Sequence, residues 1–171
     1  MGSASYAHRL INLGCAKTDM QSIIKCKVAS KEKLFERLSK LQARGNALQL
    51  FDIDAVIDPL HLDAAYENAL RTFEEGTNIA RSIAVEMILF TAFTTQIGEA
   101  VRLAGFKKDR AILFSADGKG AKLLGRLVVP EAELEPEPNP VAIKRYGMAR
   151  ISPEKIDLEI LTRMAESRLG P

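Results

Sequence analysis

The residues of this sequence that could do chemistry are mainly carboxylates. Asp52 and Asp54 alternate along a predicted strand, so both point to the same side of it. The pair could bind a cation, although an acidic strand edge that resists aggregation is the alternative. Glu86 stands in a helix that is otherwise apolar on nearly every side. Because burying an ionised carboxylate alone costs several kcal/mol, we expect Glu86 to form an ion pair, to cap a helix end or to face a partner.

Residues 117–125, Asp-Gly-Lys-Gly-Ala-Lys-Leu-Leu-Gly, form a glycine-rich stretch. They depart from the phosphate-binding loop, which requires Gly-x-x-x-x-Gly-Lys-Ser/Thr. The stretch is therefore predicted to be a turn with flexible glycines. Contact with phosphate through its backbone N–H groups, Lys119 and Lys122 is the alternative.

The sequence has no recognisable catalytic or metal-binding pattern. His8 and His61 lack a second ligand three or four residues away, and His61 is expected to be solvated or to cap a helix. No Ser, Cys or Lys lies in a known nucleophile motif. Cys15 and Cys26 are expected to be reduced thiols, with a disulfide between neighbouring strands as the alternative. We therefore expect no enzyme, no metal ion and no cofactor.

Basic residues gather in the second half of the chain, where Asp109 and Asp117 are the only carboxylates among them: Arg102, Lys107, Lys108, Arg110, Lys119, Lys122 and Arg126. Such a cluster is usually a solvated face, and contact with a phosphate backbone, which would depend strongly on salt, is the alternative. Gln96 lies in the first turn of a predicted helix, whose exposed N–H groups favour a phosphate or carboxylate. The net charge of +2 is too small to indicate a nucleic-acid-binding protein by itself.

Length and composition predict one domain spanning residues 1–171. Hydrophobic residues make up 47% and charged residues 27% of the chain, as in ordinary globular proteins. Residues 1–5 are expected to be disordered or to derive from cloning. Because Glu86 divides the longest apolar stretch and the first residues lack the pattern of a signal peptide, we expect a cytoplasmic protein with no membrane span.

Hydrophobic periodicity and helix caps predict strands around a central run of helices, which favours an α+β fold with a small mixed or antiparallel sheet. The predicted strands are residues 6–13, 22–28, 47–56, 111–115 and 127–129, with a strand or turn at 141–146 and an exposed loop at 130–140. The predicted helices lie between Ser30 and Gly45, from Pro59 to Glu75, from Asn78 to Phe93 and from Gln96 to Ala104, with one or two turns at 119–126 and a last helix from Ser152-Pro153-Glu154.

The segment from Glu86 to Phe106 holds the most distinctive motif of the chain. It contains Glu86-Met-Ile-Leu-Phe, Thr95-Gln96-Ile97, Glu99-Ala100 and Gly105-Phe106, flanked by Asn78, Lys144-Arg-Tyr146 and Ile151-Ser-Pro-Glu154. This pattern resembles the central motif of the kinase-binding subunit of the KEOPS complex, in its archaeal form, over roughly residues 45–168. Relatives often have Arg directly before Gln-Ile, where this chain has Thr95.

The resemblance implies a non-catalytic subunit. The KEOPS complex makes threonylcarbamoyladenosine next to the anticodon of transfer RNAs that read codons starting with A. Its kinase-binding subunit binds the kinase-like ATPase of the complex, and in archaeal relatives it also holds the 3′ CCA end of the transfer RNA. We therefore expect contact with the kinase-like ATPase at Leu161 and Met164, on the apolar stripe of the last helix, and contact with RNA at Thr95, Gln96, Arg102, Lys107, Lys108, Lys119 and Lys122.

Two other functions are compatible with the sequence. A small-molecule enzyme or sensor would be built from Asp52, Asp54, Glu86 and the loop at residues 117–120, and it requires these groups to meet in one pocket. A homo-oligomeric scaffold would bury the surplus apolar helix in a contact between copies of the chain.

Overall fold

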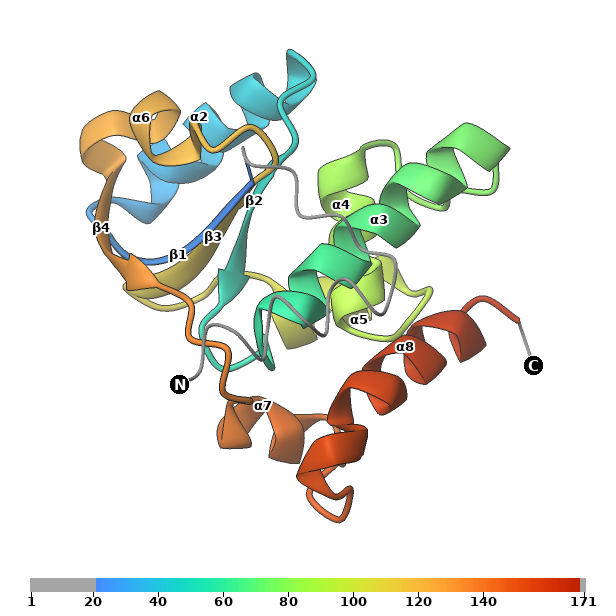
Figure 1. Ribbon diagram of the computed structural model, residues 1–171. Helices are drawn as coiled ribbons and strands as arrows, with labels where there is room; N and C mark the ends of the chain where they lie inside the picture. The colour runs from blue at the N-terminus through green and yellow to red at the C-terminus, as the bar shows by residue number, and fades with distance from the viewer. Residues whose placement is uncertain (1–20, 170–171) are drawn as a thin grey trace.

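The strands of the protein form one four-stranded antiparallel sheet, which the helices cover on both faces (Figure 1). This computed structural model describes residues 21–169. The strands are β1 (Ser22–Val28), β2 (Leu48–Asp52), β3 (Arg110–Ser115) and β4 (Val128–Glu133), in the spatial order β2-β3-β1-β4. The predicted α+β class is therefore confirmed, with an antiparallel sheet. The strand predicted at residues 6–13, Cys15 and its alternative disulfide, and residues 1–5 lie outside the described residues.

Alternate side chains of the strands point to two separate cores. On one face, α2 (Lys31–Ala43) and α6 (Gly120–Leu124) cover Leu50, Leu113 and the buried thiol of Cys26. Burial and the charge of Glu131 raise the pKa of this thiol to about 11, so it stays protonated at neutral pH. The short 3-10 helix η1 (Gly125–Leu127) connects α6 to β4.

The opposite face of the sheet packs against the larger helical part of the protein. Phe51, Ile112 and Phe114 reach this core, which contains the residues of α3 (Pro59–Glu75) and α4 (Ile83–Thr91) that face the sheet. α5 (Ile97–Ala104) follows α4, and α7 (Pro140–Arg145), the 3-10 helix η2 (Pro153–Lys155) and α8 (Ile156–Glu166) complete this side. Within residues 21–169, none of the helices combines the length and the apolar character needed to cross a membrane.

Local signals position α3 as the sequence predicts. The Asp58 carboxylate accepts a hydrogen bond from the backbone N–H of His61 at 3.0 Å, and Pro59 occupies the first helical position. Gly76 ends the helix with a left-handed φ of 69°, which a glycine adopts without steric cost. These caps determine where the carboxyl end of α3 stops, and that end forms one wall of the groove described below.

The structure corrects four predicted boundaries. The apolar helix begins at Ile83 rather than Asn78, because Ser82 caps it and the preceding residues form a loop. β2 ends at Asp52, where the carboxylate accepts a hydrogen bond from the N–H of Asp54 and turns the chain. Residues 140–145 form a helix instead of a strand, because Asn139 caps it and a proline starts it. Residues 130–133, expected in a loop, extend β4 at the sheet edge, where proline is tolerated.

Candidate functional site

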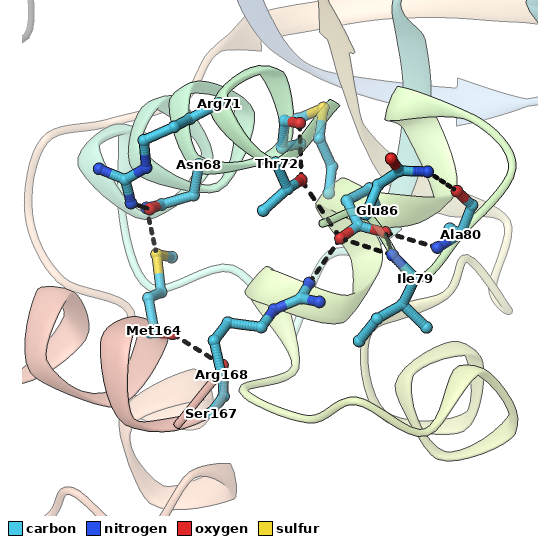
Figure 2. Close-up of polar contacts among 12 residues, drawn as sticks. Asn68, Arg71, Thr72, Ile79, Ala80, Glu86, Met164, Ser167 and Arg168 are labelled. Atoms are coloured by element: carbon cyan, nitrogen blue, oxygen red, sulfur yellow. Dashed lines mark hydrogen bonds and ion pairs between the residues drawn. The ribbon is translucent and has the colours of Figure 1, made fainter. Parts of the chain in front are cut away.

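Glu86 lies at the centre of a buried polar network in the first turn of α4 (Figure 2). Its side chain is 0% exposed, and its Oε2 accepts hydrogen bonds from the backbone N–H groups of Ile79 at 3.1 Å and Ala80 at 2.7 Å. The Thr72 hydroxyl of α3 lies 3.3 Å from Oε1. Glu86 thus fixes the loop that joins α3 to α4. Because the loop N–H groups of Ile79 and Ala80 bind Glu86, α4 does not extend back through them.

The charge of Glu86 is balanced by Arg168, just beyond the end of α8. Arg168 Nη2 lies 2.9 Å from Glu86 Oε1, and the guanidinium carbon lies 4.0 Å from the centre of the Phe90 ring. The Arg168 side chain is 17% exposed, and burial lowers the pKa of its guanidinium although Glu86 opposes the shift. The expectation of an ion pair at Glu86 is confirmed, and a role for Glu86 at a partner surface is excluded by its burial.

A groove of about 710 Å³ opens beside this ion pair. Its walls come from the carboxyl-terminal half of α3, from the segment that joins α4 to α5, and from the end of α8. Aromatic and hydroxyl side chains face basic and acidic ones across it: Phe90, Phe93, Thr94 and Thr95 on the α4–α5 side, Arg71 and Glu75 on α3, and Glu166 and Arg168 on α8. The groove therefore offers the Phe93 ring, the Thr95 hydroxyl and the exposed Arg71 guanidinium to a ligand.

Phe93 connects this groove to the core. Its ring stacks on His61 with 5.1 Å between ring centres and meets Tyr146 edge-on at 5.0 Å. His61 is fully buried, and its Nδ1 accepts a hydrogen bond from the backbone N–H of Ile57 at 3.2 Å. Burial lowers the pKa of His61 to about 3. The expectation that His61 is solvated or caps a helix is therefore wrong, and Asp58 is the cap.

Thr95 and Gln96 are exposed where α5 begins. The Thr94 hydroxyl accepts a hydrogen bond from the N–H of Gln96 at 3.2 Å and donates one to the Glu99 carboxylate at 2.9 Å. The Glu99 carboxylate thus lies close to the N-terminus of α5, where we expected an external anion. Thr95 lines the groove, so this residue keeps its candidate role.

The basic residues expected to bind RNA are distributed over different parts of the surface. Lys107 and Lys108 precede β3, whereas Lys119 and Lys122 follow its other end. Lys108 pairs with Asp54, and Arg110 lies 2.7 Å from Glu131. Within residues 21–169, the groove lining includes Thr95 but none of the lysines of this cluster. The cluster is therefore not one continuous basic face, and contact of its members with phosphate stays a prediction.

The four groups of the enzyme or sensor alternative do not meet, although Asp52 and Asp54 are neighbours. Asp52 lies 3.4 Å from Arg145 and pairs with Ala111 at the start of β3, whereas residues 117–120 follow the end of that strand. The loop is a closed turn: the Ser115 hydroxyl donates to Asp117 and accepts from the N–H of Gly120, both at 2.9 Å. A side chain at Gly120 would come within 2.8 Å of Ser115 Cβ. Gly120 thus serves close packing and Gly118 adopts a left-handed φ of 69° in the turn, and the four groups form no common pocket.

The expectation that Met164 contacts the kinase-like ATPase is wrong. Met164 is 1% exposed and belongs to the core, and Leu161 is partly buried against the same core. Exposed apolar side chains occur on several elements, including Leu158 of α8 at 66%. On α5, Ile97 and Val101 are 44% and 47% exposed and lie one turn apart, so they form an adjacent pair. This pair is the better candidate for an apolar contact with another protein.

Sequence reasoning did not identify Phe93, Arg71 or Arg168 as site residues. The signal for Arg168 was indirect, because a buried carboxylate requires a cation but the sequence does not say which one.

A comparison with models of known protein families gave no match for this chain, and a comparison with curated proteins gave no significant one. The residues of the groove and of the Glu86–Phe106 motif are thus what indicates a function for this protein.

Proposed function

We propose that this protein is a non-catalytic subunit of a KEOPS complex, which binds the 3′ CCA end of transfer RNA in the groove and also binds the kinase-like ATPase. One observation carries the proposal. The motif that resembles the kinase-binding subunit, Glu86 to Phe106, also supplies Phe90, Phe93 and Thr95 to the groove. Glu86, from the same motif, holds Arg168 in the opposite wall.

The side chains of the groove suit an unpaired RNA end. Single-stranded RNA is bound by stacking its unpaired bases on aromatic rings and by hydrogen bonds to base edges, with a few contacts to phosphate. Phe93 provides a partly exposed ring, Thr95 provides an exposed hydroxyl, and exposed Arg71 provides a cation. Because Glu75 and Glu166 also line the groove, we expect base contacts to contribute more than phosphate contacts.

The second half of the proposal requires a surface for the kinase-like ATPase. Ile97 and Val101 form an exposed apolar stripe on α5, next to the groove wall in sequence but on the outer face of the helix. Apolar residues exposed one turn apart on a helix are a common contact with a partner protein. We expect this stripe, rather than Met164, to contact the ATPase.

The test is binding of the full chain to one transfer RNA with and without its CCA end, at two salt concentrations. The intact RNA should bind more tightly, and Arg71→Ala should weaken binding and reduce the slope of log K against log salt by about 0.7 if it meets one phosphate. The matched control is Lys40→Ala, which removes one positive charge on α2, outside the groove lining and outside the basic cluster. This control should bind like the unmodified protein. Equal affinity for the two RNAs would refute the CCA role.

A further inference from the structure

Phe93 has an unusual backbone conformation. Among residues 21–169 it is the only non-glycine residue with a positive φ, at 53°. A side chain in the left-handed region brings Cβ close to the following carbonyl, at a cost of about 1–2 kcal/mol. Bulky residues are rarely found there, and the strain persists only when the surroundings hold the residue in place.

The end of α4 requires a left-handed residue at this position but does not require an aromatic one. The Phe93 N–H donates to the Phe90 carbonyl at 3.1 Å, and the Thr94 N–H donates to the Leu89 carbonyl at 3.1 Å. These two bonds form a Schellman motif, in which the left-handed position is most often glycine. Glycine would therefore complete the turn without strain, and the ring must contribute something that the turn does not need.

The surroundings hold the ring in one orientation at the groove. His61 supports one face of the ring at an interplanar angle of 10°, and Tyr146 meets it at 86°. The Tyr146 hydroxyl is itself tied to the Ala55 carbonyl at 2.9 Å, so these two supports are fixed in the core. Phe93 remains partly exposed and lines the groove beside Thr94 and Thr95. The ring is thus oriented before any ligand arrives, which reduces the entropy lost on binding.

We propose that Phe93 is the stacking surface for one unpaired nucleobase, the terminal adenine of the RNA end. The proposal rests on the proposed function and names the residue that recognises the last base. Every nucleobase has a flat π face that can stack on an aromatic ring, so Phe93 contributes affinity for a base without reading its edge. The neighbouring Thr95 hydroxyl lies on the same groove wall, where it can meet the base edge or the ribose.

The test compares two versions of one transfer RNA, one ending in CCA and one ending in CC. Phe93→Leu removes the aromatic face but keeps an apolar side chain, and it should weaken binding of the CCA form by roughly 5- to 140-fold. The same variant should leave the affinity for the CC form unchanged, because the stacked base is missing from that RNA. Phe93→Tyr keeps the ring and should bind both forms like the unmodified protein.

Phe93→Gly is the control for an effect on folding, because glycine adopts the left-handed conformation of this turn without strain. It should retain the secondary structure in a circular-dichroism melt and lose the same preference for the terminal base as Phe93→Leu. Equal weakening of both RNAs by Phe93→Leu, or no weakening of either, overturns the inference but leaves the CCA role of the groove intact. If the unmodified protein itself binds equally to transfer RNAs with and without the CCA end, the proposed function fails, and this inference fails with it.

Discussion

Replacing Glu86 tests how strongly the ion pair beneath the groove stabilises the fold. Glu86→Gln removes the charge that balances Arg168 and replaces one of two acceptor oxygens with an N–H₂ donor. Breaking a buried pair by removing one partner costs about 3–5 kcal/mol. Arg168 is 17% exposed and regains part of its solvation, so we expect a loss of about 2–4 kcal/mol of unfolding free energy. For a chain of 171 residues, this corresponds to a melting point lower by about 4–16 °C.

The comparison with Arg168→Met separates the charge from the packing. Met keeps an apolar stem against the Phe90 ring, and Glu86 keeps its hydrogen bonds from the N–H groups of Ile79 and Ala80. The remaining carboxylate is therefore partly stabilised, and we expect Arg168→Met to cost less than Glu86→Gln. In the double variant neither charge is left alone, so the two losses should not add and the coupling should be about 1–3 kcal/mol.

Urea unfolding followed by circular dichroism measures all three variants and the unmodified protein under the same conditions. Unchanged m-values would show that the variants alter stability rather than the extent of unfolding. If Glu86→Gln costs less than about 0.5 kcal/mol, or if the losses of the single variants simply add, the Glu86–Arg168 ion pair does not stabilise this fold.

Three further predictions address the core and the partner surface. Burial keeps His61 neutral in the folded protein, with its pKa lowered to about 3. Between pH 6.5 and 3 the unfolded chain therefore binds a proton at His61 that the folded chain does not. The unfolding free energy falls as pH falls through this window. Between pH 8 and pH 5 the loss from His61 should be about 2 kcal/mol, and His61→Gln should flatten this part of the curve in urea titrations. Val101→Glu should abolish co-purification with the kinase-like ATPase from the same genome while leaving the melting point within a few degrees, because Val101 is 47% exposed. Met164→Glu should lower the melting point severely, because it puts a charge into the core, and a stable Met164→Glu variant would contradict this assignment.

Local signals in the sequence were sufficient for the elements whose ends are determined by their own residues. Asp58, Pro59 and Gly76 define α3 through a cap, a first-turn proline and a left-handed stop, and all three act over a few residues. The alternation around Cys26 likewise predicts β1. The antiparallel order of the sheet depends on pairing between distant strands, and single-strand periodicity contains no information about it.

The predicted start of α4 was wrong because a side-chain contact six to seven residues away, together with the Ser82 cap, overrides local propensity. Ile79 and Ala80 lengthen the apolar helix when the sequence is taken alone, but the Glu86 carboxylate binds the N–H groups of these two residues in a loop. A helix through these residues would instead direct those N–H groups along the helix axis. Without them, the buried Glu86 carboxylate would lose two donors, which costs more than the few helical hydrogen bonds gained.

The groove could not be predicted because it depends on tertiary packing of three separate segments. The sequence alone indicated the α4–α5 wall, since Thr95 lies at a predicted helix start. The other walls come from α3 and from the end of α8, where Met164 and the residues after it line the groove. The same packing keeps Glu86 away from any ligand in the groove. Glu86 is sealed beneath the groove, and through Arg168 it determines where the end of α8 lies. The motif therefore shapes the groove in two ways, by placing Phe93 and Thr95 in its lining and by positioning the wall that faces them.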